Sequence, residues 1–302
     1  MICKNKQVAP RFGRKLSPSE KGPKMDLNKI RIVTDSSADI IKLDTLPVVS
    51  APLKINTDLA EYVDTPELDV SAMTRDLATY KGKSTTTCPS MGAYLDAFGD
   101  AEYVFCITIT SKLSGSYNVA LSAAREYEEM YPDRRVAVID SRNTGPGMRL
   151  LAERIEVLAV AGKSFDEVLR EVEDYRDETE LLFLLESLNN LANNGRVSRA
   201  VAKIAGILGI RMLGQAVGGV IEPVAKPRGE EKSLQTILEK MLSLGYHGGK
   251  VRISHCENER AAGKLAALIR EAYPDADIMV YPARALCSFY AEMGGLLIGL
   301  EK

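Results

Sequence analysis

The chain has 302 residues, and hydrophobic residues make up 45% of it, enough for a sizeable core divided between two domains. Its 39 Lys and Arg residues nearly balance 41 Asp and Glu residues, which gives a net charge of −2, and Trp is absent. This balance argues against a basic nucleic-acid-binding surface. The aromatic content of only 6% also argues against stacking platforms for bases.

The five cysteines are scattered along the chain and form no C-x-x-C pair: they are Cys3, Cys88, Cys106, Cys256 and Cys287. Such a pattern indicates neither a disulfide framework nor a zinc site, and it fits a reducing cytoplasm. No stretch approaches the ~20 apolar residues that a membrane span needs. We therefore expect a cytoplasmic protein that is not an integral membrane protein, with transient membrane contact left open.

Residues 1–27 are expected to form a disordered or extended tail. Residues 1–24 carry seven Lys or Arg and one Glu, and they lack the apolar segment of a secretory signal. The sequence leaves open whether these residues belong to the natural protein, because Met25 is also a natural start.

Strand and helix patterns alternate through residues 28–175, the expected N-terminal domain. In chain order they are a strand at Lys29–Val33, an extended segment at Leu46–Ile55 that is interrupted by Pro47 and Pro52, a helix at Val70–Tyr80, a strand at Tyr103–Ile109, a helix at Ser116–Met130, a strand at Arg135–Ile139, a helix at Gly147–Ala161 and a helix at Ser164–Glu178 that bridges to the second domain. This alternation predicts an α/β fold with a parallel, doubly wound sheet.

Residues 176–302 have a different pattern of expected strands and helices, which includes a hairpin and predicts an α+β domain with a mixed sheet. The expected elements are a strand at Leu181–Leu185, helices at Leu188–Ala192 and Val201–Leu208, a hairpin of Arg211–Val217 and Val220–Ala225, a helix at Ser233–Leu244, a strand at Lys250–His255, a helix at Arg260–Tyr273, a strand at Ile278–Tyr281 and an apolar segment at Leu286–Leu300. Gly218-Gly219 between the two hairpin strands is a strong turn signal.

Three strands of the first domain end in polar turns, namely "TDSS" at Thr34–Ser37, "TSKLSG" at Thr110–Gly115 and "IDSR" at Ile139–Arg142. In an open parallel sheet, ligands bind outside the carboxyl ends of the strands. We therefore expect the three turns to converge on one edge and to form the site there.

Catalysis by a serine or cysteine nucleophile is poorly supported. A triad needs a base beside the nucleophile, and the only histidines are His247 and His255. The G-x-S-x-G motif is absent, so Ser111 and Ser114 are weak candidates. Cys256 directly follows His255 in an expected strand, where neighbouring side chains point to opposite faces.

Metal or nucleotide chemistry defines the alternative function. Asp35, Asp39 and Asp140 follow strands and could approach one another, although acidic residues in such turns are more often caps and turn formers. Neither G-x-x-x-x-G-K-[ST] nor G-x-G-x-x-G occurs. A metal-assisted hydrolase or phosphoryl-transfer enzyme that uses these turns is thus the second hypothesis.

Ser114-Gly115 precedes an expected helix, whose first backbone N–H groups are unpaired and partly positive. Taken alone, Ser114 fits a helix N-cap better than an anion site. A second hydroxyl-rich stretch, "STTTCPS" at Ser84–Ser90, precedes another expected helix. Two such entries on one sheet edge favour a carboxylate or phosphate held by neutral donors.

Six segments in order, over about 270 residues, resemble the DegV family, the fatty-acid-binding subunits of bacterial fatty-acid kinases. They are "IVTDSSADI" at Ile32–Ile40, "TTCPS" at Thr86–Ser90, "TSKLSGSY" at Thr110–Tyr117, "VIDS" at Val138–Ser141, "LNNLANNGRVS" at Leu188–Ser198 and "GIRMLGQAVGGVIEPVAKPRG" at Gly209–Gly229. The resemblance implies two domains with a lipid tunnel between them, a bound fatty acid as ligand, no cofactor and no catalytic residue.

The same resemblance implies roles for single residues. Thr86 and Ser114 would hydrogen-bond the carboxylate of the fatty acid, with backbone N–H groups near Gly115 in support. Arg196 would belong to the polar network around the head group. Arg228 would face a separate kinase, which makes the acyl phosphate. Taken without the resemblance, both arginines fit solvated surface charges better.

This chain departs from the family pattern near its C-terminus. Tyr290 falls where the family has a His before G-P-G, and "IRM" at Ile210–Met212 replaces a more usual lysine–proline pair. A tyrosine hydroxyl can still donate to a carboxylate, but a phenol with a pKa of ~10 supplies no positive charge near neutral pH. The apolar runs Ile204–Leu213 and Leu286–Leu300 are the candidate tunnel lining, and ordinary hydrophobic core is the alternative interpretation of both.

Overall fold

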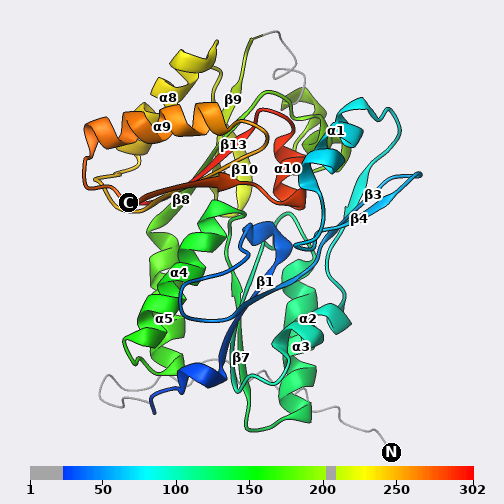
Figure 1. The fold of residues 1–302 in the computed structure, drawn as a ribbon, viewed down its shortest axis with the longest axis vertical. Coiled ribbons are helices and arrows are strands. Elements are labelled where there is room, and N and C mark those ends of the chain that lie inside the picture. Colours follow the sequence, from blue (N-terminus) through cyan, green and yellow to red (C-terminus); the bar gives the residue numbers. More distant parts are fainter. Residues whose placement is uncertain (1–22, 202–208) are drawn as a thin grey trace, which may run out of the picture.

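The computed structural model describes residues 23–201 and 209–302, which build a parallel sheet and a mixed sheet stacked along the long axis of the molecule (Figure 1). Apart from Val201, the helix expected at Val201–Leu208 lies outside the described residues, as does most of the expected tail. At the end of the expected tail, Lys24 bridges to Ser164 and Met25 is buried.

The parallel sheet has the strand order β2-β1-β6-β7. Its strands are β1 (Ile30–Asp35), β2 (Val48–Ala51), β6 (Tyr103–Thr108) and β7 (Arg135–Asp140). All three neighbouring pairs run parallel, with Ile32 beside Val48 on one side and beside Phe105 on the other. This confirms the predicted parallel sheet, and it brings the ends of β1, β6 and β7 to one edge.

Helices cover both faces of the parallel sheet (Figure 1). They are α2 (Met91–Phe98) and α3 (Ser116–Met130) on one face, and α4 (Pro146–Val160) and α5 (Phe165–Asp177) on the other. Strand side chains alternate between the two cores: Ile32 and Phe105 pack toward α4 and α5, whereas Val33 and Cys106 pack toward α2 and α3.

Helix α5 belongs to the half of the molecule that contains the parallel sheet. The prediction that this charged helix bridges the two domains is therefore wrong. A capping box of Ser164 and Glu167 fixes its start. Its apolar side chains, Val168 and Val172 among them, are buried in the core formed with α4 and the parallel sheet.

A small antiparallel sheet, β4-β3-β5, projects beside the parallel sheet and carries α1. Its elements are β3 (Lys54–Asn56), β4 (Glu61–Val63), β5 (Thr85–Thr87) and α1 (Val70–Thr79). The segment Leu46–Ile55, expected to be extended and interrupted by Pro47 and Pro52, forms two strands. It divides at Pro52, which has no N–H to donate, into β2 of the parallel sheet and β3 of the small sheet.

The mixed sheet has the order β10-β9-β8-β13-β11-β12, in which β11 and β12 run parallel and the other pairs antiparallel. Its strands are β8 (Thr179–Leu185), β9 (Met212–Val217), β10 (Val220–Ala225), β11 (Val251–His255), β12 (Ile278–Pro282) and β13 (Leu296–Glu301). Helices α8 (Glu230–Ser243) and α9 (Glu259–Ala272) bury one face (Figure 1). The mixed sheet predicted for this half is confirmed.

The apolar segment expected at Leu286–Leu300 divides into helix α10 (Ala285–Ala291) and strand β13. β13 enters the centre of the sheet between β8 and β11, although it comes last in the chain. The short helix α6 (Asn189–Asn193) contacts α10 through the Asn190 side chain, which donates to the Phe289 carbonyl at 2.8 Å.

The β9–β10 hairpin turns where the sequence predicts. Gly218 and Gly219 have φ values of 56° and 86°, the left-handed region that tight hairpin turns require. The tip touches the parallel half, because the Thr110 hydroxyl donates to the Gly219 carbonyl at 3.0 Å.

Candidate functional site

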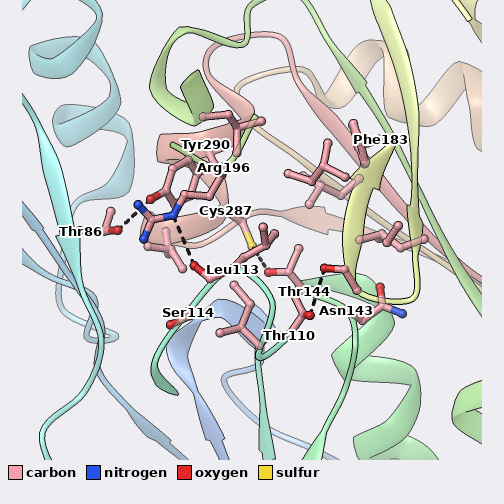
Figure 2. A pocket seen from close by; sticks show the side chains of 18 of the residues that line it. Thr86, Thr110, Leu113, Ser114, Asn143, Thr144, Phe183, Arg196, Cys287 and Tyr290 are labelled. Carbon is pink, nitrogen blue, oxygen red and sulfur yellow. Dashed lines mark hydrogen bonds between the residues drawn. The ribbon is translucent and has the colours of Figure 1, made fainter. Parts of the chain in front are cut away.

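A cavity of about 320 Å³ lies between the two sheets (Figure 2). One wall is the turn after β6, from Ile109 to Gly115, and the opposite wall is the inner face of the mixed sheet. The sides come from β5, from α10 and from the hairpin tip. The polar turns after β6 and β7 therefore face a largely apolar chamber, whereas no residue of the turn Thr34–Ser37 after β1 lines it, so the expectation that all three turns form the site is wrong for that turn.

The apolar wall follows from the alternation of β8. Leu181, Phe183 and Leu185 line the cavity, whereas Leu182 and Leu184 point into the core under α8 and α9. Both faces of β8 are thus buried, which explains its uninterrupted apolar sequence.

Hydroxyl groups meet at one end of the cavity. Thr86 Oγ1 and the Tyr290 hydroxyl are 2.7 Å apart, and they reach this point from β5 and from α10. The Arg196 guanidinium lies beside them, with its carbon atom 6.0 Å from the centre of the Tyr290 ring, and its Nε donates to the Leu113 carbonyl at 3.3 Å. Figure 2 shows these side chains on the same side of the cavity.

The buried carboxylate of Asp35 holds the turn that carries Ser114. Its Oδ2 accepts the Ile109 N–H at 2.8 Å and the Ser116 hydroxyl at 2.5 Å, one on each side of that turn. Burial raises the pKa of Asp35. Gly115, not Ser114, is the cap of α3, and Ser114 Oγ accepts the Ser116 N–H at 3.2 Å.

Asp140 fixes the same turn from β7. Its carboxylate accepts the Ser111 N–H at 3.1 Å and the Ser111 hydroxyl at 2.5 Å. Within residues 23–201 and 209–302, no group of three His, Cys, Asp or Glu side chains is placed to hold a metal ion. Asp35 and Asp140 thus hold hydroxyl and amide groups of one turn, as the structural interpretation of these acidic turns expects.

The polar end carries little formal charge. Burial raises the pKa of Tyr290, opposed by the hydrogen bond with Thr86 and by the charge of Arg196, so the phenol is neutral near pH 7. An anion placed at the Thr86–Tyr290 end would meet neutral hydroxyl donors and the guanidinium of Arg196.

Five of the residues singled out in the sequence line this cavity: Thr86, Ser114, Gly115, Arg196 and Tyr290. Arg228 lies elsewhere, exposed at the end of the hairpin, where it pairs with Ile210 in an isolated bridge. Of the expected lining, residues 204–208 are outside the described chain, and Met212 and Leu213 pack into the cores. The segment that forms α10 and β13 does contribute, through Leu286, Cys287, Tyr290, Ala291 and Leu297.

Several lining residues were not singled out by the sequence. Asn143 and Thr144 follow β7 and reach the cavity beside Thr110, and Cys88 lies next to Gly115. The sequence contained features that could have identified these residues, because Asn143 and Thr144 directly follow the "IDSR" turn and Cys88 lies within "TTCPS".

Neither histidine, both of which the structure describes, lies on the cavity wall. His255 is on β11, where burial lowers its pKa, and burial raises the pKa of the neighbouring Cys256 thiol to about 11. A thiol with this pKa is a poor nucleophile near pH 7.

The fold and the site together define an α/β protein that encloses an apolar cavity with one hydroxyl-rich end between a parallel and a mixed sheet. The family model described as "uncharacterised protein, DegV family" matches residues 29–301, almost the whole of the described chain. The chain belongs to the DegV family. A DegV domain-containing protein of Streptococcus pneumoniae is 40% identical over 276 residues, which are 90% of this chain and 98% of that protein.

Two solved structures are similar along their whole length. A DegV family protein from Eubacterium eligens, crystallised with heptadecanoic acid, is 43% identical with a TM-score of 0.89, over 90% of this chain and 99% of that chain. The fatty acid kinase (Fak) B3 protein of Streptococcus pneumoniae, crystallised with linoleic acid, is 39% identical with a TM-score of 0.88, over 90% and 99%. None of the helices described here is long and apolar enough to cross a membrane.

Proposed function

We propose that this protein binds a fatty acid, with the carboxylate at the Thr86–Tyr290 end of the cavity and the acyl chain along the inner face of the mixed sheet. The observation that carries the proposal is the cavity itself, whose strand-derived wall is apolar and at whose end hydroxyls from three elements collect. Each buried CH₂ contributes ~0.8 kcal/mol, so the tail supplies most of the affinity and the head group sets the orientation.

In this arrangement Thr86, Ser114 and Tyr290 donate hydroxyl hydrogen bonds to the carboxylate, and backbone N–H groups near Gly115 and the charge of Arg196 support them. The two similar proteins crystallised with heptadecanoic and linoleic acid support this assignment. No residue acts as a nucleophile or a proton-transfer catalyst, so the protein is a binding subunit and not an enzyme. No cofactor is required.

The first test of the binding site is whether the purified protein contains a bound fatty acid. Denaturing the purified protein and analysing the extract by mass spectrometry should release a long-chain fatty acid in near-stoichiometric amount. Thr86→Val, Ser114→Ala and Tyr290→Phe should each weaken fatty-acid binding roughly tenfold, because each removes a hydrogen bond to a charged group. Unchanged affinity in all three variants would contradict the proposed head-group site.

We further propose that the bound carboxylate is presented to a separate fatty-acid kinase, in a cytoplasmic setting, and that Arg228 faces this kinase. Arg228 is exposed and does not touch the cavity. Arg228→Ala should lower the rate at which a cognate kinase phosphorylates the bound lipid, without changing lipid affinity. Arg125, an exposed arginine on α3, provides the matched control. Tyr290→His tests whether the family histidine raises that rate.

We also infer two domains, residues 28–175 and 176–302, as the sequence predicts. The core under α8 and α9 supports this division, because it draws only on residues from Leu182 onward.

A further inference from the structure

Helix α10 forms one side of the cavity and is buried between the small sheet and the mixed sheet (Figure 1). Its C-terminal part carries Tyr290, which meets Thr86 at the polar end. Contacts that fix the axial position and the rotation of α10 therefore also fix the position of the Tyr290 hydroxyl.

Two buried carboxylates hold the beginning of this helix. Asp39 Oδ1 accepts the Arg284 N–H at 2.8 Å. Asp64 accepts the Ala285 N–H at 3.3 Å and the Leu286 N–H at 3.1 Å, one with each oxygen. These are three of the N–H groups that a helix leaves unpaired at its start, and carboxylates are their strongest partners.

The Asp64 carboxylate has a compensating charge. The Arg284 guanidinium lies 3.5 Å from Asp64 Oδ1 and also donates to the Thr65 carbonyl. Asp39 is 4% exposed and Asp64 is 3% exposed, so neither contact is loosened by surrounding water.

The same small sheet contacts α10 at both ends. Asp64 directly follows β4, and Thr86 lies on β5, with β3 between these two strands. In the middle, Ala285 and Phe289 of α10 pack against Ile55 of β3. The sheet and the helix are thus joined at one end through Asp64, in the middle through apolar side chains, and at the other end through the Thr86–Tyr290 contact.

We propose that Asp39 and Asp64 are positioning residues for head-group recognition: by holding the N–H groups of residues 284–286, they set the place of Tyr290 opposite Thr86. The proposal rests on the fatty-acid site proposed above. It adds two residues that touch no ligand and lie in the chain 245 and 222 positions before the backbone groups they hold.

The test compares oleic acid with oleyl alcohol, which share the acyl chain and differ in the head group. Asp39 has a positive φ of 57°, so Asp39→Gly removes the carboxylate without backbone strain, and Asp39→Asn keeps an acceptor oxygen at a φ that Asn tolerates. Asp39→Gly and Asp64→Ala should reduce the acid-to-alcohol affinity ratio roughly tenfold, whereas Asp39→Asn should preserve it. An equal loss of affinity for both ligands would mean a merely structural role and would overturn the proposal.

A double-variant cycle checks that the effect passes through Tyr290. Tyr290→Phe should lower the same ratio, and Asp64→Ala combined with Tyr290→Phe should lower it no further than Tyr290→Phe alone. Fully additive losses would contradict the proposal. Ser164→Ala is the matched control, because it removes a cap acceptor from α5, a helix that does not line the cavity, and should leave the ratio unchanged.

A measurement on the ligand-free protein can test the positioning role of Asp39 and Asp64 independently of fatty-acid binding. Fluorotyrosine incorporation gives a ¹⁹F signal for Tyr290, identified by its loss in Tyr290→Phe. Asp64→Ala and Asp39→Gly should shift or broaden that signal, and Ser164→Ala should not. If the wild-type protein bound no fatty acid, the proposed function would fail, and the ¹⁹F signal would still decide the positioning role. An unshifted signal in both variants would refute it.

Discussion

Asp39 is a buried carboxylate whose ionisation the fold disfavours. Burial raises its pKa from 3.8 to about 7, opposed by the hydrogen bond from the Arg284 N–H. Its Oδ2 has no hydrogen-bond partner among the residues that the structure describes. The titratable or charged side chains that face it from neighbouring elements are Asp64 after β4, Arg284 and Cys287 at α10, Tyr281 on β12 and, beyond Tyr281, Arg149 on α4.

This pKa predicts a pH-dependent stability difference. Between about pH 4 and pH 7 the folded protein keeps the Asp39 proton that the unfolded chain has lost, so the contribution of Asp39 to the free energy of unfolding falls as pH rises. Asp39→Asn removes this effect. The variant should therefore gain stability relative to wild type by up to about 1.4 kcal/mol per pH unit across that window. Urea unfolding at several pH values measures the difference, and a difference that is flat with pH would contradict the assignment.

The position of Phe183 on the cavity wall predicts a limit on the length of the acyl chain that the cavity can hold. It lies directly across from Gly214 on the neighbouring strand, and a Cβ on Gly214 would come within 2.2 Å of the Phe183 ring. Gly214→Ala should push the ring into the cavity and weaken the longest fatty acids most, at ~0.8 kcal/mol for each CH₂ that loses its place. Phe183→Leu should shift the preference toward longer chains. Competition binding with saturated fatty acids of increasing length measures both, and an unchanged length profile would exclude Phe183 as the limit.

At the residue scale, the sequence located the polar end of the cavity better than its supports. Thr86 and Ser114 stood in the hydroxyl-rich segments "TTCPS" and "TSKLSGSY", and Tyr290 stood at a recognisable departure from the family pattern. Asp64 stood in no motif, and Asp39 stood in "IVTDSSADI" but was considered only as a turn former or metal ligand. The N–H groups that they hold lie more than 200 positions away, and a cap supplied from so far along the chain leaves no local pattern.

At the scale of an element, we expect substitutions at the tip of the β9–β10 hairpin to affect fatty-acid binding. A Cβ on Gly219 would lie 2.3 Å from Thr110 Oγ1, whereas nothing lies within 4 Å of the corresponding position on Gly218. Both substitutions to Ala strain a positive φ, by about 1–2 kcal/mol each. Gly219→Ala should in addition separate the tip from Thr110, on the cavity wall, and weaken fatty-acid binding roughly tenfold.

Gly218→Ala is the matched variant for that experiment. It should lower the melting temperature with little effect on the dissociation constant of the fatty acid, because Gly218 does not line the cavity. Equal losses of affinity in the two variants would show that the contact between the tip and Thr110 does not support the binding site.

Elements with strong local signals were predicted from the sequence, and elements held by pairing alone were not. The capping box of α5 and the paired glycines of the hairpin act within a few residues. The strands of the small sheet have only three residues each, too few for an alternating pattern, so Thr85–Thr87 was not recognised as a strand. Thr86 takes its position from pairing with Ile55, which lies 31 residues earlier.

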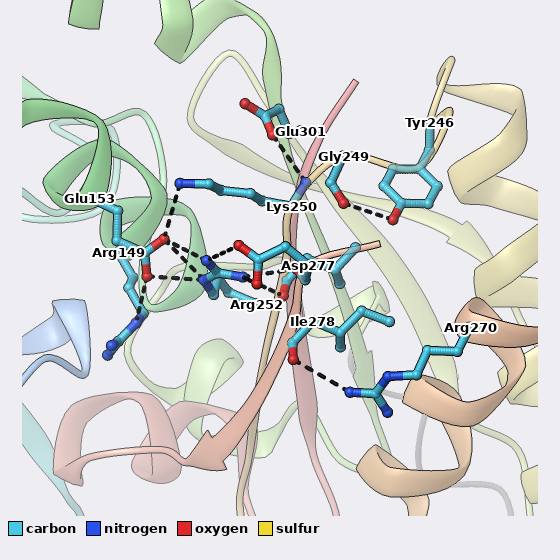
Figure 3. Close-up of polar contacts among 11 residues, drawn as sticks. Arg149, Glu153, Tyr246, Gly249, Lys250, Arg252, Arg270, Asp277, Ile278 and Glu301 are labelled. Carbon is cyan, nitrogen blue, oxygen red and sulfur yellow. Dashed lines mark hydrogen bonds and ion pairs between the residues drawn. The ribbon is translucent and has the colours of Figure 1, made fainter. Parts of the chain in front are cut away.

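At the scale of the whole molecule, α4 joins the two sheets. Its beginning packs against β13 so closely that a Cβ on Gly299 would lie 2.7 Å from the Pro146 carbonyl carbon. Farther along, Glu153 of α4 accepts hydrogen bonds from Arg252 of β11 at 2.8 and 2.9 Å (Figure 3). This ion pair could not be predicted from the sequence, because "VRIS" has the pattern of an ordinary strand and the partner of Arg252 lies 99 positions earlier.

Arg252 and Glu153 form the centre of a buried charged cluster. The Arg252 side chain is 4% exposed and that of Glu153 is 12% exposed. Arg149 Nε lies 3.0 Å from Glu153, and Asp277 lies 2.9 Å from Arg252. The Arg252 hydrogen bond lowers the pKa of Asp277. Removing Arg252 or Glu153 leaves the other buried with unbalanced charge, which is the costly case for ion pairs inside proteins, whereas Asp277 is 58% exposed.

Arg252→Met should therefore lower the free energy of unfolding by about 3–5 kcal/mol, and Glu153→Leu by a similar amount. The double variant should lose less than the sum, because Arg252 and Glu153 are then removed together and neither is left buried opposite the other's empty place. The exposed pair of Lys232 and Glu239 on α8 is the control, and Lys232→Met should change stability by less than about 1 kcal/mol. Hydrogen exchange measured on peptides from α4 and β11 should rise together in the single variants, since this pair connects the two sheets. Faster exchange confined to one of these peptides would show that the ion pair does not couple the halves that enclose the cavity.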